Sequence, residues 1–344
     1  MVNGMRAHFN EVNAAGGIAG QTFELITLDD GYDPDSAELQ MKKLIEDDKV
    51  LAVIGNVGTP TATRTVPLAN RHHVPLIGAF SGASLLRKEP PDRFIINYRA
   101  SYDEEMEAIV NALLDQDIHA EKIAFFTQND SYGNAGYQGA IKALNKRGVS
   151  DTQKLVHGRY TRNTLHIEEG LAKIINAATT PQAVIMVGTY GPTAKFIRTA
   201  KKILPDTLFI SISFVGAHAL ARELNGCCDD VFISQVVPPL TTDLPAVHAF
   251  RKAFKKYYDG KAENDVSFEG YLVATLVTKA VRQSSKQITR TSLIETLESF
   301  SDLDIGIGMN LNYSTTEHQG SHHIWLTRIE GDNVIASEWP SLRR

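Results

Sequence analysis

Two short runs of small and hydroxyl-bearing residues carry the clearest chemistry in the sequence, Gly58-Thr59-Pro60 and Ser81-Gly82-Ala83-Ser84. Each run is expected between a strand and a helix, where free N–H groups and the helix dipole attract a carboxylate or phosphate. Either run alone is more often an ordinary helix cap or turn. In open sheets, however, ligands bind beyond the carboxyl ends of strands, and both runs are expected there. Together they predict an anion-binding site.

Three aromatic residues are expected at the ends of further strands: Tyr132, Tyr190 and Phe214. An aromatic residue in such a place usually serves packing or lies on the surface. Three of them facing two anion-binding loops across a cleft would form a pocket with aromatic walls and a few polar groups. The sequence therefore favours a small-molecule site over a catalytic centre.

Motifs for nucleotide binding, nucleophilic catalysis and metal binding do not occur in the sequence. It holds no G-x-x-x-x-G-K-[ST], no G-x-G-x-x-G after a strand, no G-x-S-x-G and no H-E-x-x-H. The pairs His72-His73 and His322-His323 are adjacent, so their side chains diverge in regular structure. The acidic run from Asp29 to Asp35 lacks the glycine and glutamate of a calcium loop. We expect no cofactor, no metal and no enzymatic activity.

Strand and helix patterns alternate along most of the 344 residues, a length typical of two domains. This alternation predicts doubly wound α/β lobes. Val53–Ala62 resembles Ile185–Ala194, which favours two lobes of the same build. Strands are expected at 22–28, 50–54, 75–80, 95–98, 122–127, 155–160, 183–187, 208–213 and 231–236, with a β ribbon over 309–339 that turns at 330–333. Helices are expected at 1–13, 34–46, 60–72, 102–114, 136–147, 165–177, 192–203, 217–224, 244–258, 268–282 and 292–300.

Composition and charge exclude several classes of protein. The chain is 43% hydrophobic and 22% charged, which excludes a disordered or collagen-like chain. With 35 basic and 40 acidic residues its formal charge is −5, so it has no electrostatic footprint for nucleic acid or an anionic membrane. The two cysteines, Cys227 and Cys228, are adjacent, and two free thiols are expected rather than a strained ring.

Several motifs resemble those of the extracytoplasmic substrate-binding proteins of ABC importers. The resemblance is to the type I periplasmic group that includes the leucine/isoleucine/valine-binding proteins, and it runs from Gly4 to the final ribbon. The most specific motif is N-E-V-N-A-A-G-G-I-A-G at Asn10–Gly20. Supporting motifs are Asp29-Asp30, Val53-Ile54-Gly55, Asp130-Ser131-Tyr132-Gly133 and Val187-Gly188-Thr189-Tyr190.

The resemblance implies two α/β lobes that are joined by a three-stranded hinge and close on a small solute in a cleft. Lobe 1 would comprise residues 1–118 and about 237–300, and lobe 2 with the hinge ribbon 119–236 and about 301–344. Val57-Gly58-Thr59 and Ser81-Gly82-Ala83 would hold the ligand carboxylate, with Tyr132 and Tyr190 closing over it. A further contact would come from Phe268.

Ser213, next to Phe214, stands where members of that family commonly carry an acid for the amino group of the ligand. This departure leaves the solute open among an amino acid, a related organic acid and an amide. Members of the family also begin with a strand before the helix that opens this chain. The resemblance therefore implies that the first strand of lobe 1 and a signal peptide are missing from this sequence.

The function that follows from the resemblance is that of a periplasmic or extracytoplasmic receptor. Its partners would be a small solute and a membrane-embedded ABC permease, with no nucleic acid, and the receptor would be a monomer. The alternative is a ligand-sensing domain of a regulator or receptor with the same fold.

Overall fold

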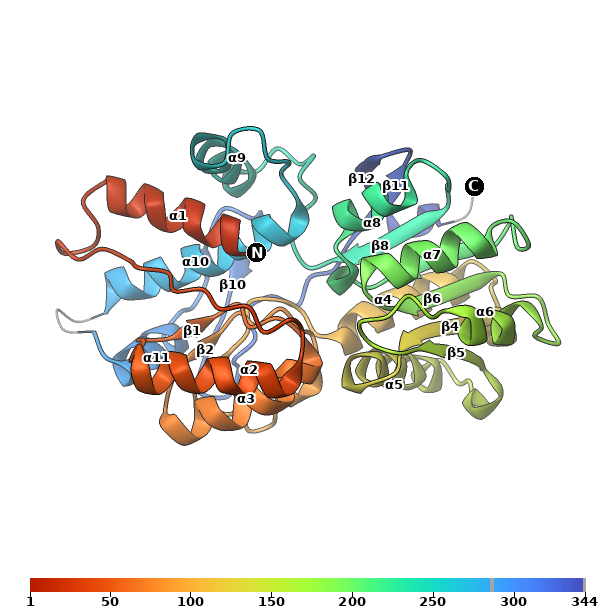
Figure 1. Ribbon diagram of the computed structural model, residues 1–344, viewed down its shortest axis with the longest axis horizontal. Helices are drawn as coiled ribbons and strands as arrows, with labels where there is room; N and C mark the ends of the chain where they lie inside the picture. The colour runs from red at the N-terminus through yellow and green to blue at the C-terminus, as the bar shows by residue number, and fades with distance from the viewer. Residues whose placement is uncertain (285–287, 343–344) are drawn as a thin grey trace. The chain divides into compact units, whose positions relative to one another are not determined.

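A computed structural model describes residues 1–284 and 288–342 of the chain, in two compact units. The first unit holds Met1–Ala100 and Thr242–His322, and the second holds Ser101–Thr241 and His323–Arg344, so the chain passes between them three times (Figure 1). These boundaries differ from those expected near residues 118 and 300. The helix α4 (Tyr102–Asp115) packs against α5 (Ser131–Lys146) in the second unit. The segment before residue 322 stays with the first unit because Asn97 N–H donates to His318 O.

The first unit contains a small parallel sheet with the strand order β1-β2-β3. Helices α2 and α3 pack against each other, and α1 packs against α9 and α10 (Figure 1). Helix α2 begins as predicted, because Asp33 accepts hydrogen bonds from the N–H groups of Asp35 and Ser36. A π-helical turn, Lys43–Asp47, continues it. The elements are β1 (Val53–Ile54), β2 (Leu76–Ile77), β3 (Ile95–Ile96), α1 (Val2–Ala14), α2 (Pro34–Lys42), α3 (Thr59–His72), α9 (Pro245–Tyr257), α10 (Asp265–Gln283), α11 (Arg290–Glu298) and the ribbon β9 (Leu303–Asp304) with β10 (Asn310–Leu311).

The strand expected at residues 22–28 is not formed, and that prediction was wrong. A cavity of about 460 Å³ lies between Leu25–Leu28 on one side and β1 with Asn56 and Val57 on the other. Paired strands lie only about 4.8 Å apart, so this segment is out of reach of the β1 backbone. Ile26 and Leu28 consequently remain 37% and 36% exposed.

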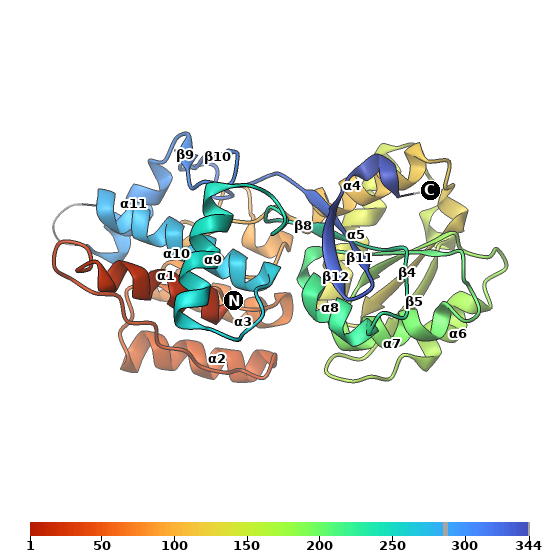
Figure 2. The ribbon, with the colours of Figure 1, turned by 90° about the horizontal axis from the view of Figure 1, so that it is seen from above.

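The second unit is built on a seven-stranded sheet with the order β12-β11-β8-β7-β6-β4-β5. Strands β4 to β8 are parallel, and the β11–β12 hairpin joins the edge at β8 in antiparallel register (Figure 2). The strands are β4 (Ile123–Gln128), β5 (Val156–Tyr160), β6 (Ala183–Val187), β7 (Leu208–Ser211), β8 (Val231–Gln235), β11 (Trp325–Glu330) and β12 (Asn333–Ser337). Their positions confirm the strands and the hairpin expected from the sequence.

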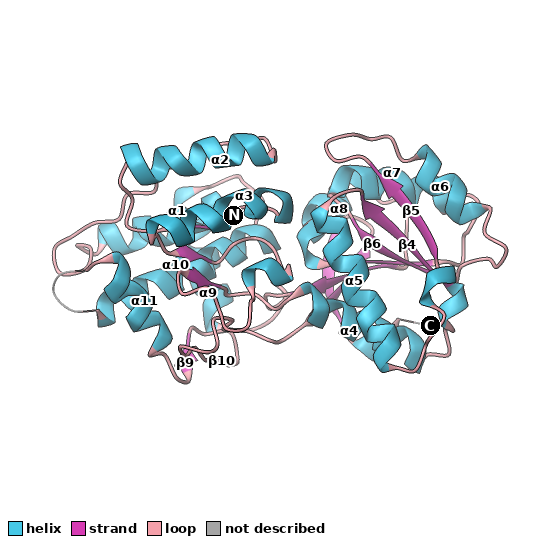
Figure 3. Cartoon of the chain, turned by 90° about the horizontal axis from the view of Figure 1, so that it is seen from below, coloured by secondary structure: helices cyan, strands magenta, loops and turns pink. Residues whose placement is uncertain are grey.

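Helices cover both faces of this sheet, which confirms a doubly wound unit (Figure 3). Neighbouring side chains of a strand point to opposite faces. Accordingly, the Phe126 ring lies 4.2 Å from that of Phe196 on α7, whereas the Phe125 ring lies 5.1 Å from that of Tyr137 on α5. The remaining helices are α6 (Glu168–Ile175), α7 (Tyr190–Ala200) and α8 (Ala217–Leu224), which pack on the Phe126 face.

The turn between α8 and β8 carries a disulfide between Cys227 and Cys228. The expectation of two free thiols was therefore wrong. Asn225 and Gly226 both have positive φ, and this sharp turn of the backbone leads directly into the two cysteines. Among the described residues, no helix combines the length and the apolar character that crossing a membrane requires.

Candidate functional site

The two predicted anion-binding loops lie side by side in the first unit. Val57 pairs with Phe80 in an isolated parallel bridge, and Gly58 N–H donates to Phe80 O at 3.1 Å. Gly58 has a φ of 102°, and a Cβ there would lie 2.3 Å from the Tyr32 ring. Glycine is therefore the residue that this close approach allows, and its place next to Phe80 brings the two loops together.

A pair of buried hydroxyl groups joins the loops. Thr59 Oγ1 lies 2.8 Å from Ser81 Oγ, and the two residues are 1% and 0% exposed. One hydroxyl hydrogen is used within the pair, which leaves the other for an acceptor such as a carboxylate oxygen. Thr59 also begins α3, so the positive end of that helix dipole lies at the pair.

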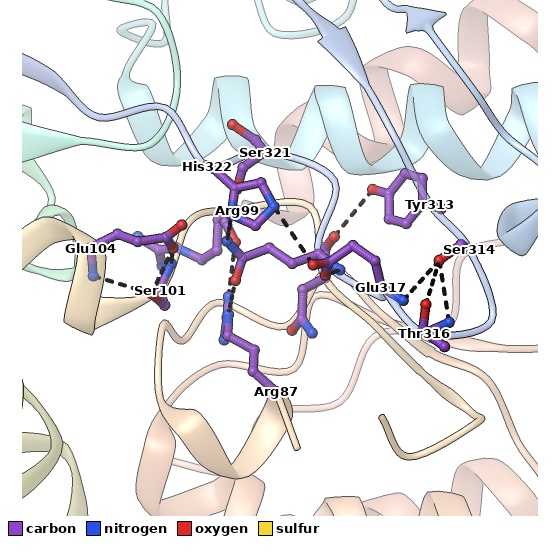
Figure 4. A network of polar contacts seen from close by, with 12 residues as sticks. Arg87, Arg99, Ser101, Glu104, Tyr313, Ser314, Thr316, Glu317, Ser321 and His322 are labelled. Carbon is purple, nitrogen blue, oxygen red and sulfur yellow. Dashed lines mark hydrogen bonds and ion pairs between the residues drawn. The ribbon is translucent and has the colours of Figure 1, made fainter. Parts of the chain in front are cut away.

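The Ser81 loop differs from its prediction, because only the 3₁₀ turn Ser84–Leu86 follows it rather than an α-helix. The positive charge beside it comes instead from Arg87. Figure 4 shows Arg87 in a polar network that also includes Arg99. The Arg87 guanidinium donates to the carbonyl oxygens of Ser81 and Ala83, both at 3.2 Å, to Arg99 O at 2.8 Å and to Gln319 Oε1 at 2.5 Å. Arg87 thus fixes the carbonyl side of the loop and places a cation behind it.

Sequence reasoning missed Arg87. The local sequence gave little indication of its role, because an arginine six residues after a serine predicts no particular contact in an irregular segment. Its partner Gln319 lies 232 residues away in the chain.

In the second unit, the rings of Tyr132 and Phe214 lie close together. Their ring centroids are 4.5 Å apart, and Tyr102 extends the group at 5.6 Å from Tyr132. We call Tyr102, Tyr132 and Phe214 the aromatic cluster. Asp130 places Tyr132 by accepting its N–H at 3.0 Å, as the cap of α5. Tyr102 was missed, although the S-Y-D-E pattern that starts α4 marks its position.

Tyr190 is the first residue of α7 and is 48% exposed. The turn before it is held by Tyr160, whose hydroxyl accepts Thr189 N–H at 2.9 Å and donates to Gln128 Oε1 at 2.9 Å. Burial raises the pKa of Tyr160 to about 12, so this phenol keeps its proton and its donor role at neutral pH. The neutral hydroxyl of Tyr160 therefore orders the turn that precedes Tyr190.

Ser213 contacts a carboxylate that the sequence did not predict there. Its N–H donates to Glu105 Oε2 at 2.8 Å and its hydroxyl donates to Oε1 at 2.9 Å. Ser234 on β8 donates its hydroxyl to Oε2 at 2.5 Å, and Glu105 itself has no exposed surface. Because Glu105 and Ser213 are 108 positions apart, no local motif could reveal this pairing.

Phe268 is placed differently from the other predicted residues. It is fully buried on α10, with its ring 5.2 Å from that of Phe250 on α9. The structure thus gives it a packing role in the interior of the first unit. In neither unit do the described residues include three or more potential ligands that could hold a metal ion together.

The profile of a family described as periplasmic binding proteins matches residues 1–333 of this sequence. The chain belongs to this family. A crystal structure of a possible leucine/isoleucine/valine-binding protein from Rhodopirellula baltica is 42% identical, covers 99% of this chain and 92% of that chain, and superposes with a TM-score of 0.96. The family resemblance and the fold class expected from the sequence are thereby confirmed.

Two further proteins are similar to this chain, one in its fold and one in part of its sequence. A branched-chain amino acid ABC transporter protein from Thermus thermophilus, solved with bound valine, is 17% identical, covers 97% of this chain and 89% of that chain, and has a TM-score of 0.84. An amino acid binding protein of Pseudomonas aeruginosa is 25% identical over 217 residues, which are 63% of this chain. The match spans 56% of the length of that curated relative.

Proposed function

We propose that this chain is the solute-binding receptor of an ABC importer, in an extracytoplasmic location, and that it binds a small amino acid. The observation that carries the proposal is the buried hydroxyl pair of Thr59 and Ser81 at the start of α3, with Arg87 behind it, in a periplasmic binding protein. One remaining hydroxyl donor, a helix dipole and a cation suit a carboxylate. The 42% identical structure titled as a possible leucine/isoleucine/valine-binding protein supports an aliphatic amino acid as the ligand.

In this proposal each predicted residue has a defined role. The hydroxyl hydrogen that the Thr59–Ser81 pair does not use internally binds the carboxylate, together with the backbone N–H groups of Val57 and Gly82. Tyr190 and the aromatic cluster pack against the rest of the solute. Phe268 contributes by packing inside the first unit.

The partners are the solute and a membrane permease that receives it. A receptor binds its solute reversibly and breaks no bond in it. Hydroxyl groups, backbone amides and aromatic rings are suited to such reversible binding. Incubation of the protein with candidate metabolites, followed by mass spectrometry, checks the point. Any turnover would contradict the proposal.

A thermal-shift screen with amino acids, aromatic acids and short-chain amides tests the ligand class. A ligand at 100 times its Kd stabilises the folded protein by about 2.7 kcal/mol, which is readily measured as a rise in Tm. We expect L-leucine, L-isoleucine or L-valine to raise the Tm. Stabilisation only by compounds without a carboxylate would refute the assignment of the Thr59–Ser81 pair.

A further inference from the structure

Two exposed apolar side chains of the second unit lie together at the start of helix α7. Among the described residues of this unit, the large apolar side chains on the surface are Leu165, Tyr190 and Ile203, which are 53%, 48% and 54% exposed. Single exposed residues of this kind are ordinary on a protein surface. Leu165 and Tyr190, however, share the first turn of α7, whereas Ile203 lies beyond the other end of that helix.

Both the side chain and the backbone of Leu165 contact α7. The Leu165 Cδ2 atom lies 3.4 Å from the place that a Cβ of Gly191 would take. The Leu165 carbonyl oxygen accepts a hydrogen bond from Lys195 Nζ at 2.8 Å. Gly191 and Lys195 are four residues apart, so they lie on the same face of the helix. Leu165 is therefore held over the first turn of α7, beside Tyr190.

The loop that carries Leu165 is ordered by hydrogen bonds of its own. It joins β5 to α6, and the Thr164 hydroxyl donates to Thr161 O at 2.7 Å and accepts His166 N–H at 3.3 Å. Ile167, two residues after Leu165, is 1% exposed and belongs to the core beneath α6 and α7. The exposure of Leu165 is thus a property of an ordered loop that buries its neighbouring isoleucine.

Leu165 lies at the edge of the sheet where the other candidate residues of this unit lie. It follows β5, Tyr190 follows β6, and Tyr132 follows β4, the parallel strand between these two. In open α/β sheets, ligands bind beyond the carboxyl ends of the strands. The apolar surface of Leu165 and Tyr190 is therefore in the place where the proposed function requires contacts with the solute.

The charged groups next to Leu165 compensate each other. Lys195 Nζ lies 2.5 Å from Glu168 Oε1, and the hydrogen bond from Lys195 lowers the pKa of the Glu168 carboxyl, which stays ionised at neutral pH. Such a pair offers no net charge to attract an acidic or basic group of a ligand. Apolar surface is covered favourably by another apolar group, because both lose contact with water. An aliphatic side chain therefore suits this place better than a charged one.

We propose that Leu165, beside Tyr190, contacts the aliphatic side chain of the amino-acid ligand and is a specificity-determining residue of the receptor. The proposal rests on the proposed function and extends it from the carboxylate to the side chain of the solute. The alternative is that Leu165 is an exposed leucine without a contact to the ligand, which the experiment must separate.

Three single variants, titrated with L-leucine in a calorimeter, test the assignment. Leu165→Asn replaces the apolar side chain by a polar one of similar shape, and Leu165→Met keeps it apolar. Ile203→Asn is the matched control, because it makes the same kind of change at an equally exposed residue beyond the other end of α7. Both positions are on the surface, so all three variants should keep the wild-type Tm.

We expect Leu165→Asn to raise the Kd of L-leucine about tenfold, the scale of a leucine contact that is partly removed from water. Leu165→Met should stay within about threefold of the wild type, and Ile203→Asn should bind like the wild type. An unchanged Kd in Leu165→Asn would overturn the proposal. An equal loss in Leu165→Met or in Ile203→Asn would overturn it as well.

L-alanine separates a contact with the ligand side chain from an indirect effect on the rest of the site. It has the same ammonium and carboxylate groups as L-leucine but only a methyl side chain. We expect the preference of the wild type for L-leucine over L-alanine, measured by displacement, to fall about tenfold in Leu165→Asn. Equal weakening of both probes would overturn the proposal.

Failure of this proposal can be distinguished from failure of the proposed function. A wild type that binds other amino acids but not L-leucine overturns the role of Leu165 alone. A wild type that binds no amino acid refutes the proposed function, and this proposal with it.

Discussion

Replacing Thr59 with valine is the sharpest test of the carboxylate site. Valine keeps the shape of the side chain, so no cavity forms at this buried position, but the hydroxyl that lies 2.8 Å from Ser81 Oγ is lost. Ser81 retains Ala83 N–H as a donor at 3.3 Å, so the loop keeps a hydrogen bond of its own. The fold should therefore tolerate the change.

The expected loss of affinity follows from the groups that remain. The backbone N–H groups, the α3 dipole and Arg87 are all retained, and only one hydrogen bond to a charged group disappears. Such a bond contributes about 1.5 kcal/mol, which corresponds to a Kd about tenfold higher. Thr59→Asp adds a negative charge beside that of the ligand, so it should abolish binding.

Calorimetric titration with L-leucine measures this effect, and Thr63→Val is the matched control. Thr63 lies on the same helix and donates to Pro60 O at 2.6 Å, but its side chain is exposed. We expect the control to bind like the wild type. If Thr59→Val and Thr59→Asp both bind L-leucine with the wild-type Kd and keep its Tm, the carboxylate is bound elsewhere and the reasoning fails.

Three other predictions concern the aromatic wall, the response to ligand and the response to acid. Tyr190→Ala should weaken L-leucine binding more than Thr59→Val, because a large aromatic contact is lost, and titration of both variants decides this. Saturating ligand should lower the radius of gyration in small-angle scattering, as expected from lobe closure, and an unchanged profile would contradict that expectation. Burial lowers the pKa of His8 from 6.5 to about 4, so the folded state holds this ring neutral. The unfolded chain takes up the proton first as the pH falls from 6.5 to 4, which costs about 3 kcal/mol of stability over that range. Urea unfolding at both pH values should show a smaller pH dependence for His8→Gln, and equal dependence would refute the assignment.

Sequence patterns predicted those elements whose chemistry is local. Asp33 caps α2 and Ser101 caps α4 through side-chain atoms within three residues of the cap, so both helices could be placed from the sequence. The fully buried runs of β4 and β6 were equally clear. The segment 22–28 has the same kind of pattern, yet pairing depends on a neighbouring strand that no local window contains.

The residues of the candidate site likewise include some that the local sequence reveals and some that depend on distant partners. Thr59, Ser81 and Tyr132 follow strands directly, so their loops could be located from the chain alone. Arg87 was missed because its partner Gln319 is distant in the sequence. Glu105 was missed for the same reason, since its partner Ser213 is 108 positions away. Contacts between side chains that are far apart in the sequence produce no regular spacing of residues from which they could be predicted.

Ser213 shows how this limit affects the assignment of a ligand. A serine at a position where an acid is expected argues against an amino acid only if the charge must come from that same residue. A ligand, however, responds to the charge at a point in space, and the two Ser213 donors lie 2.8 and 2.9 Å from the Glu105 carboxylate. The carboxylate next to the serine is therefore carried by another element, helix α4. The serine by itself therefore gives no reason to exclude an amino acid as the ligand.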